Sequence, residues 1–376
     1  MTMRRRDRKK RDFLTLADLS LTEHERLFAR SAQLKTERDE GQTHTTLAGK
    51  TLTLVFEKAS TRTRVSFEAA LVQLGGHVIT LPGSESQIAR GEPPEDTARV
   101  LSRYVDGIML RTFADERLRA FAGAATVPVI NGLSDGAHPV QLLADLFTVK
   151  ERFGTVRDVP MAFVGDGATN MGRSWIEAAR VFGFDLFLAA PEGYRPDAEE
   201  LHPRVRLTAD PIEAVRGARV VSTDVWTSMG QEHEAAARKE AFRGYLVDEP
   251  LLSHADPSAI VLHCLPAHRG EEISADVLDG PRSAVWDEAE NRLHVQKALL
   301  ELLLLGLASE EPRNHDAEAR RHPHGAGAGL GPHRHRASLR VRLLRHPGHQ
   351  GAARGGAPRG AVEQQPGHHH DGPGPR

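Results

Sequence analysis

The chain has 376 residues, of which 27% are charged, and a formal net charge of −2 at pH 7. This length exceeds what one compact core usually needs, so we expect two domains and some additional chain. Cys264 is the only cysteine, which excludes intramolecular disulfides and cysteine-based zinc clusters and fits a reducing, cytoplasmic location. The basic start, residues 4–11, lacks an apolar signal core after it, so secretion is not expected.

The additional chain is residues 308–376. This segment holds 10 of the 20 histidines and 12 of the 34 glycines but no Phe, Trp, Tyr or Lys, so it cannot bury enough apolar surface to offset its chain entropy. Its 11 arginines and 6 acidic residues give a net charge of +5, which leaves −7 for the remainder. We therefore expect a disordered tail behind a mildly acidic globular body that binds neither nucleic acid nor a membrane.

Apolar, β-rich runs alternate with amphipathic stretches through the body, which is typical of parallel sheets covered by helices on both faces. The strands expected in the first half are residues 51–56, 77–81, 107–111 and 127–131. Those expected in the second half are residues 161–164, 185–189, 218–222, 259–264 and 284–286. The fold class predicted is α/β, with two doubly wound parallel-sheet domains joined by helices.

Two helices are expected to join the domains. Residues 138–153 have apolar positions at helical spacing between the two groups of strands, and the helix at 291–307 would pack back on the first domain. The predicted organisation is a first domain at 1–137 with a disordered basic start at 1–11, the connecting helix at 138–153, a second domain at 154–290, the last helix at 291–307 and the tail at 308–376.

A cluster of hydroxyl and guanidinium groups follows the first expected strand. Ser60-Thr61-Arg62-Thr63-Arg64 opens a helix, so free backbone N–H groups, the positive helix end, three hydroxyls and arginine would converge on one anion. An ordinary Ser/Thr helix cap with solvated arginines is the alternative. The interleaving of two arginines with three hydroxyls favours a phosphate site.

Residues 56–69, FEKASTRTRVSFEA, resemble the carbamoyl phosphate loop of the aspartate and ornithine carbamoyltransferases. The resemblance continues through residues 86–92, 107–111 and 138–141 and ends near residue 307, with Val140 where the family usually has Thr and Ala89 where Gly is common. It implies that carbamoyl phosphate is bound by Ser60, Thr61, Arg62, Thr63, Gln87, Arg111, His138, Gln141, Cys264, Leu265 and Arg292. Gln87 would reach into the site of a neighbouring subunit, because the family is built on trimers.

Taken singly, each of these residues also fits an ordinary structural role. Arg111 could be a salt-bridged strand end, His138 a helix cap before Pro139, and Gln141 a solvated residue of a first helical turn. A glycine-rich turn at residues 164–172 also invites a dinucleotide-binding interpretation, which Glu192 after the next strand keeps open. The fingerprint lacks its third glycine, however, because Asn170 stands there.

Residues that would bind the acceptor follow in the second half. The turn at 164–172 resembles the family segment whose Asn, here Asn170, holds the amino-acid end of ornithine, and residues 224–230 resemble the loop that closes over ornithine and that the aspartate enzymes lack. Asp224, Ser228 and Met229 would contact ornithine there; an exposed loop around one buried Trp is the alternative. Cys264 in His263-Cys264-Leu265-Pro266 is either a small core residue or, beside Asp224, a group that polarises the amine.

The resemblance therefore implies carbamoyl transfer from carbamoyl phosphate to the side-chain amine of ornithine, through a tetrahedral intermediate and with neither metal nor cofactor. The catalytic residues would be Arg111, His138, Asp224 and Cys264. Another acceptor amine (aspartate, putrescine or an acylated ornithine) is the nearest alternative. A non-catalytic relative would lack Arg62, Arg111 or His138, all of which are present. Binding of nucleic acid or metal by the tail, through residues 368–370, is a third hypothesis, and a tail read in another frame or past a stop codon is a fourth.

Overall fold

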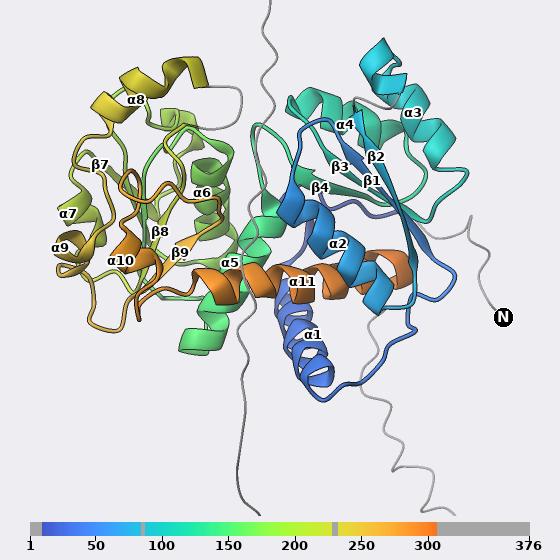
Figure 1. Cartoon of the computed structure of the whole chain (residues 1–376), viewed down its shortest axis with the longest axis horizontal. Coiled ribbons are helices and arrows are strands. Elements are labelled where there is room, and N and C mark those ends of the chain that lie inside the picture. Colours follow the sequence, from blue (N-terminus) through green and yellow to red (C-terminus); the bar gives the residue numbers. More distant parts are fainter. Residues whose placement is uncertain (1–9, 84–86, 228–231, 307–376) are drawn as a thin grey trace, which may run out of the picture. The chain divides into compact units, whose positions relative to one another are not determined.

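The computed structural model describes residues 10–83, 87–227 and 232–306, which form two parallel β-sheets with helices around them (Figure 1). The predicted α/β class with two parallel-sheet domains is confirmed. Residues 1–9, Ser228, Met229 and the tail lie outside the described residues. Within the described ranges, no helix is both long and apolar enough to cross a membrane.

The first sheet has the strand order β2-β1-β3-β4, and all of its pairs are parallel. Its strands are β1 (Thr51–Phe56), β2 (His77–Pro82), β3 (Gly107–Arg111) and β4 (Val129–Leu133). The helices in this part of the chain are α1 (Leu21–Asp39), α2 (Thr61–Gln73), α3 (Pro94–Leu101) and α4 (Asp115–Ala124). Short 3-10 turns occupy Leu16–Asp18 and Gln87–Arg90.

The second sheet has the strand order β7-β6-β5-β8-β9 and is also entirely parallel. Its strands are β5 (Met161–Val164), β6 (Leu186–Ala189), β7 (Val205–Thr208), β8 (Val220–Thr223) and β9 (Ile260–His263). Its helices are α6 (Asn170–Phe182), α7 (Pro211–Val215), α8 (Ala235–Ala241), α9 (Glu249–Leu252) and α10 (Ala275–Leu278), with 3-10 turns at Ala198–Glu200 and Glu232–Glu234.

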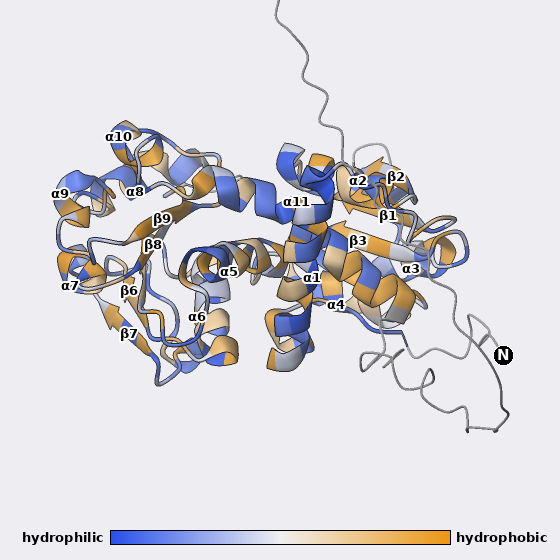
Figure 2. Ribbon diagram, turned by 90° about the horizontal axis from the view of Figure 1, so that it is seen from below, coloured by the Kyte–Doolittle hydropathy of each residue, from blue (hydrophilic) through white to orange (hydrophobic). Residues whose placement is uncertain are grey.

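Alternate residues of the central strands enter different hydrophobic clusters. Met161 and Phe163 of β5 pack with Trp175 of α6, whereas Ala162 and Val164 pack with Val215 of α7. Because successive side chains of a strand point to opposite faces, the helices cover both faces of the sheet. Such strands are apolar along their whole length, and Figure 2 shows them among the most hydrophobic segments.

Two helices run between the sheets (Figure 1): α5 (Pro139–Phe153) and α11 (Val285–Glu301), the latter continued by a π-helical turn at Leu302–Gly306. Helix α11 packs against α5, α1 and α2 and also contacts β9. It therefore touches elements that flank the first sheet and a strand of the second.

The expected strand at residues 284–286 is wrong. Ala284 is the N-cap of α11 and Val285 is its first residue, so this short apolar run is the start of a helix that was expected only from 291. A three-residue apolar run does not distinguish a strand from the first turn of a buried helix. Strand β7, an edge strand of which only Val205 is buried, was not expected from the sequence.

Candidate functional site

A cavity of about 930 Å³ opens where β1, β3, β8 and β9 end. In open α/β sheets this is the edge at which loops and helix N-termini form ligand sites. The residues that line it are Lys58, Ala59, Ser60, Thr61, Arg62, Thr63, Arg111, Leu133, His138, Asn170, Met171, Asp224, Val225, Thr227, Ala235, Cys264, Leu265, Pro266, His268, Arg269, Glu271 and Arg292.

The N-terminus of α2 forms one wall of the cavity. Ser60 is the N-cap, and its hydroxyl accepts a hydrogen bond of 3.3 Å from the Thr63 backbone N–H. The next residues therefore present backbone N–H groups that are not used within the helix, at its positive end. Arg62 donates to the carbonyl of Leu265 across the cavity. Leu265 has a φ of 58°, a left-handed conformation that Leu rarely adopts and that tends to occur at functional sites.

Arginine side chains gather beside this helix end. Arg111 is 6% exposed and Arg292 is 3% exposed. Burial, together with repulsion from neighbouring arginines, lowers the pKa of Arg111 to about 10, and mainly burial lowers that of Arg292 to about 10. The Nε atoms of both are buried without a hydrogen-bond partner among the described residues. Cations that repel one another and retain unused donors constitute a site for an anion.

His138 adds a donor without adding a charge. Its backbone N–H donates to the Ser174 hydroxyl at 2.8 Å, which fixes the start of α5 against α6. Burial, followed by the charges of Arg292 and Arg111, lowers the pKa of the His138 ring well below its usual value. The ring is therefore neutral at pH 7, and a neutral imidazole still offers one N–H to a carbonyl oxygen.

Gln141 lies directly behind the cavity and connects it to the interior. Arg292 donates to the Gln141 side-chain oxygen and, at 3.0 Å, to the hydroxyl of Thr63. Arg292 is thereby oriented by groups from α5 and α2, although its own helix is α11.

A carboxyl and a thiol face the cavity from the second sheet. The Cys264 thiol donates to Asp224 Oδ1 at 3.2 Å, and the same oxygen accepts the Val225 N–H at 2.8 Å. Burial and the neighbouring carboxylates raise the pKa of Cys264 well above its usual value, so the sulfur carries its proton at pH 7. Burial also raises the pKa of Asp224. A protonated thiol is a poor nucleophile, so this pair suits the binding and deprotonation of an amine better than covalent catalysis.

His263 orients the loop that carries Cys264. One ring nitrogen, Nδ1, accepts the Leu265 N–H at 2.9 Å, and Nε2 lies 3.0 Å from Glu272. Ligand atoms of Asp224, His263 and Cys264 lie within 4.8 Å of one another, close enough in principle for a metal ion. Both His263 nitrogens already have protein partners, and the thiol is bonded to Asp224, so the donor set is committed within the protein.

Comparison with known proteins decides the family. Residues 11–151 match the model of the aspartate/ornithine carbamoyltransferase carbamoyl-P binding domain, and residues 157–303 match that of the Asp/Orn binding domain. The chain belongs to the aspartate/ornithine carbamoyltransferase family. The ornithine carbamoyltransferase of Halorhodospira halophila is 56% identical over 299 residues, which covers 79% of this chain and 99% of the relative. That of Pelobacter propionicus is 55% identical over 303 residues, with the same coverage.

Solved structures of this family agree. The ornithine carbamoyltransferase of Burkholderia thailandensis has 49% identity and a TM-score of 0.73, and the match covers 79% of this chain and 99% of that one. The enzyme from Pyrococcus furiosus has 47% identity and a TM-score of 0.76, with 80% and 98% covered. Fold and sequence therefore give the same family.

The cavity brings together most of the residues that the sequence analysis selected. Those that line it are Ser60, Thr61, Arg62, Thr63, Arg111, His138, Asn170, Asp224, Cys264, Leu265 and Arg292, with Gln141 behind them. Gln87 is exposed and does not line the cavity of its own chain. Ser228 and Met229 lie outside the described residues.

Two carboxyl groups that support the site, those of Asp145 and Glu288, were not among the residues predicted from the sequence. Both accept hydrogen bonds from Gln141. A signal was available, because Asp145 follows Gln141 by four positions and Glu288 precedes Arg292 by four, so each pair lies on one helix face.

The glycine-rich turn between β5 and α6 is explained by packing. A Cβ atom on Gly172 would lie 2.4 Å from the Gly167 carbonyl oxygen, and one on Gly167 would lie 2.8 Å from Leu188. Asp166 within the turn is ion-paired with Arg238 at 2.6 Å. These glycines therefore permit close contacts of the chain with itself and do not require a dinucleotide.

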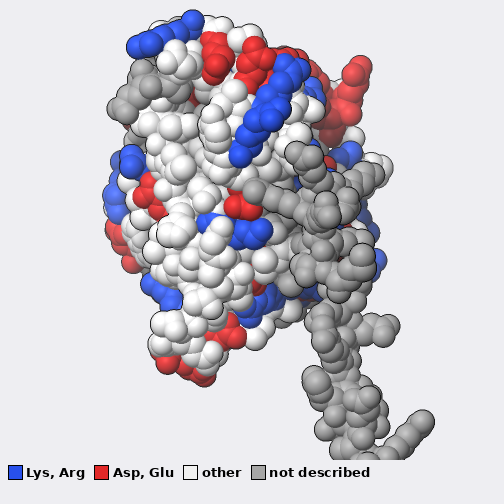
Figure 3. All heavy atoms as spheres, turned by 90° about the vertical axis from the view of Figure 1, so that its right-hand side faces the viewer, with Lys and Arg blue, Asp and Glu red and all other residues white. Residues whose placement is uncertain are grey.

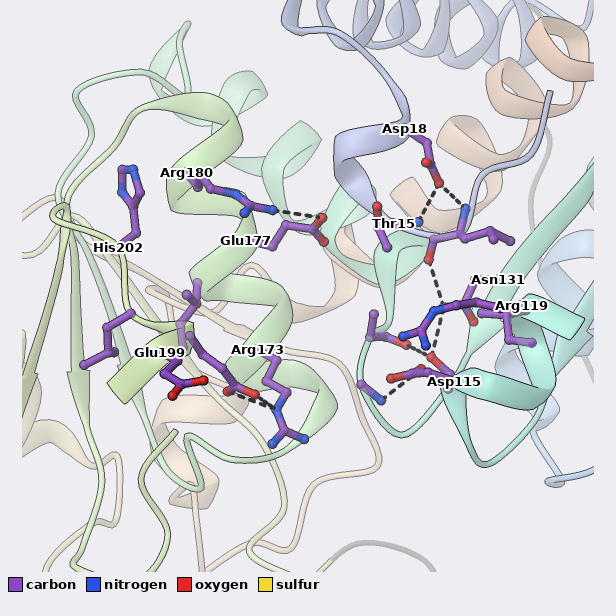
Figure 4. Close-up of a pocket in the computed structure, with 18 residues that line it drawn as sticks. Thr15, Asp18, Asp115, Arg119, Asn131, Arg173, Glu177, Arg180, Glu199 and His202 are labelled. Atoms are coloured by element: carbon purple, nitrogen blue, oxygen red, sulfur yellow. Dashed lines mark hydrogen bonds and ion pairs between the residues drawn. The ribbon is translucent and has the colours of Figure 1, made fainter. Parts of the chain in front are cut away.

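A second cavity, of about 490 Å³, is lined by residues of the helices and loops that surround the two sheets (Figure 4). Several of its charged side chains are paired with each other or with nearby backbone. Arg173 bonds Glu200 at 2.9 Å, Arg180 lies 3.8 Å from Glu177, and Asp18 accepts the N–H groups of Leu14 and Thr15 (Figure 4). This cavity thus lacks the group of unpaired buried donors that distinguishes the first.

Proposed function

We propose that this chain transfers the carbamoyl group of carbamoyl phosphate to the side-chain amine of L-ornithine, giving L-citrulline and phosphate. The observation that carries the proposal is the cavity itself. The N-terminus of α2 and three arginines can bind a phosphorylated anion, and the Asp224–Cys264 pair beside them can bind an amine. The ornithine carbamoyltransferase name of relatives above 50% identity supports the choice of acceptor.

Carbamoyl phosphate would occupy the end of the cavity near α2. The Ser60 to Thr63 segment and Arg62 would bind the phosphate, and Arg111 would lie between phosphate and carbonyl oxygen. The bound carbamoyl phosphate would accept a hydrogen bond from Arg111 Nε, which lacks a partner among the described residues. The remaining residues assigned to carbamoyl phosphate are His138, Gln141, Cys264, Leu265 and Arg292, with Gln87 supplied by a neighbouring subunit.

Ornithine would lie with its side-chain amine at Asp224 and Cys264 and its amino-acid end at Asn170. The assignment of Ser228 and Met229 to the same end rests on sequence resemblance. An alkyl amine has a pKa of about 10, so most of it is protonated at neutral pH. Asp224, when ionised, would accept a hydrogen bond from the ammonium group and favour its correct placement.

The reaction follows from this arrangement. The deprotonated amine attacks the carbamoyl carbon, a C–N bond forms, and the tetrahedral intermediate collapses as the C–O bond to phosphate breaks. Charge on the carbonyl oxygen would be stabilised by Arg111, His138 and Thr63, and charge on the leaving phosphate by Arg62, Arg111 and the α2 amides. Asp224 would accept one proton from the ammonium group before the attack, and the departing phosphate would accept the second proton from the attached nitrogen as the intermediate collapses.

The test is an assay of carbamoyl transfer with several amines offered in parallel. Ornithine, aspartate, putrescine and N-acetylornithine are each supplied with carbamoyl phosphate, and the carbamoylated product and phosphate are measured. Citrulline formation with the highest kcat/KM is expected for ornithine. A higher kcat/KM with any other amine would overturn the assignment of the acceptor, and absence of product with all four would overturn carbamoyl transfer.

We also propose a homotrimer, or a multiple of it, located in the cytoplasm and serving arginine synthesis or breakdown. Val65 and Val72 are 57% and 61% exposed on one face of α2, and Ile79 of the adjoining β2 is 46% exposed. On the side that carries α3, charged side chains occur in separate groups with uncharged surface between them (Figure 3). Exposed apolar side chains and uncharged surface between groups of charges are typical of subunit contacts. Sedimentation equilibrium tests this, and a mass of one chain would contradict it.

A further inference from the structure

Two carboxyl groups meet in the interior behind the arginines. Asp145 of α5 and Glu288 of α11 are each 1% exposed. The side-chain NH₂ of Gln141 donates to Asp145 Oδ1 at 2.8 Å and to Glu288 Oε1 at 2.7 Å, and the two carboxyl groups also hydrogen bond to each other. One of them must carry a proton for that last contact, because two carboxylates are acceptors only.

The surroundings favour one proton on the pair. Burial raises the pKa of Asp145 to about 7, and burial together with Asp145 raises that of Glu288 well above its usual range. The positive charge of Arg292 opposes both shifts, and the two carboxyl groups in turn raise the pKa of the Cys264 thiol. A single guanidinium balances one negative charge, so a singly protonated pair is the state that this site stabilises.

The pair fixes the orientation of Gln141. Because both hydrogens of its amide NH₂ are donated to carboxyl oxygens, its carbonyl oxygen must face the other way, where it accepts from Arg292. Arg292 in turn donates to Thr63 at 3.0 Å. A Gln141 amide rotated by 180° would place NH₂ against the guanidinium, two donors facing each other.

The same pair also reaches the thiol loop. Glu288 Oε2 accepts the backbone N–H of His263 at 2.9 Å, immediately before Cys264. Glu288 is thus bonded both to the group that orients Arg292 and to the strand end that carries the thiol. One Glu288 oxygen thus bonds Gln141, beside the arginine cluster, and the other bonds the end of β9, beside the thiol.

We propose that Asp145 and Glu288 form a proton-sharing positioning pair, which orients Gln141 and Arg292 toward the carbamoyl group and holds the Cys264 loop in register with them. The role assigned rests on the proposed carbamoyl transfer. Neither carboxyl touches the reacting atoms, so the pair acts through Gln141, Arg292 and His263.

Two substitutions of Asp145 separate positioning from packing. Asp145→Asn keeps both hydrogen bonds, because its oxygen accepts from Gln141 and its NH₂ donates to an ionised Glu288 in place of the shared proton. Asp145→Leu has similar size and removes both bonds. We expect kcat to stay within about 3-fold of the wild type in the first and to fall about 100-fold in the second, since small displacements of a catalytic group have effects of that size.

The KM for ornithine is expected to change much less than kcat in Asp145→Leu. A kcat for Asp145→Leu near that of the wild type would overturn the proposal. An equal loss of kcat in both variants would also overturn it, because a fixed charge on Asp145 and not a shared proton would then be required. The wild-type assay is made first, so failure of the proposed function appears as absence of citrulline before either variant is compared.

Infrared spectroscopy tests the shared proton without turnover and does not require that Asp145→Leu folds. At a pH above about 7, where the first of the two carboxyls ionises, the wild-type minus Asp145→Asn difference spectrum should contain the carbonyl stretch of a protonated carboxylic acid. Any other carboxyl group that stays protonated at this pH is common to both proteins and cancels in the difference. A difference spectrum without that band would overturn the proposal.

Discussion

The unliganded site holds three positive charges close together, those of Arg62, Arg111 and Arg292, and a bound anion would relieve their repulsion. Burial and mutual repulsion lower the pKa of Arg111, which means that the unliganded protein bears a cost for keeping these charges together. A phosphate dianion would reverse that cost, because each guanidinium would gain an opposite charge and a charge-assisted hydrogen bond. The site is therefore preorganised for the negative charge that develops during carbamoyl transfer.

Replacement of Arg62 by Ala is expected to lower kcat/KM for carbamoyl phosphate about 100- to 1,000-fold, the usual effect of removing one preorganised donor. Arg64→Ala is the matched control, since Arg64 lies on the same helix, is exposed and pairs with Glu68 at 2.9 Å. That variant should remain within about 2-fold of the wild type, as exposed pairs contribute little. Steady-state kinetics with varied carbamoyl phosphate measures both. Similar values for the two variants would remove the phosphate assignment of Arg62.

Asp224→Asn is expected to abolish citrulline formation and to raise the free energy of unfolding at neutral pH. The asparagine oxygen can still accept from Val225 and Cys264, but no buried carboxylate remains. The folded protein holds the Asp224 proton to a higher pH than the unfolded chain does. Protonated Asp224 therefore favours folding at low pH, and this contribution is lost as the pH rises from 3.8 through the raised folded pKa.

Urea unfolding at a series of pH values measures this. The advantage of Asp224→Asn over the wild type should be largest at neutral pH and should shrink as the pH falls toward 3.8. A variant that is less stable than the wild type at neutral pH would show that Asp224 is stabilised by contacts stronger than its burial cost.

The residues that face the cavity could be predicted from the sequence more readily than those behind it. Ser60 to Thr63 and Asp224 form polar clusters after apolar strands, which is a visible pattern. Asp145 is an isolated acidic residue of its helix, and Glu288 lies beside Asp287 in the first turn of another; in both contexts an acidic side chain is ordinarily solvated. Only the meeting of α5 and α11 turns them into a buried pair, and that meeting depends on tertiary packing.

At the scale of elements, α11 is held by polar contacts as well as by its apolar face. Asn291 is fully buried and donates to Thr148 at 2.9 Å and to Glu151 at 2.6 Å, both on α5, while its oxygen accepts from Lys35 of α1 at 2.9 Å. One amide thus joins three helices. Its loss would leave buried polar groups without partners.

Asn291→Ala is expected to lower the free energy of unfolding by about 2–4 kcal/mol, because it removes these bonds and leaves a small cavity. Glu290→Ala is the control on the same helix. Glu290 forms an ion pair with Arg38 in which both side chains are more than 40% exposed, so its loss should cost less than about 1 kcal/mol. Chemical denaturation of the two variants measures the difference. Equal losses would show that the amide contacts are not what fastens α11.

Strands at the centre of each sheet could be predicted from the sequence, and those at an edge or boundary could not. The bounds of β1, β3 and β5 match the apolar runs, because both faces of these strands are buried. The edge strand β7 has only one buried position, so its composition resembles that of a loop. The start of α11 was missed because Val285 and Trp286 favour a strand locally, whereas the acidic residues that follow suit the first turn of a helix.

At the scale of the whole molecule, the recognisable enzyme ends before the chain does. The second family model ends at residue 303, and the relative from Halorhodospira halophila is covered to 99% by a match that includes 79% of this chain. A segment rich in Arg, His, Gly and Pro then follows. The last described element ends at Gly306, and the last described residue that lines the cavity is Arg292.

Deletion of residues 308–376 is therefore expected to leave kcat and both KM values unchanged, and to leave the free energy of unfolding unchanged as well. The physical reason is that the second family model ends at residue 303 and that the deleted segment, which has no Phe, Trp, Tyr or Lys, has little apolar surface to bury. The full chain and the shortened chain are compared in the citrulline assay and in urea unfolding. A shortened chain with lower activity or stability would show that the tail contributes contacts to the enzyme. Intact-mass measurement of the protein from its native source would then show whether the cell makes the segment at all.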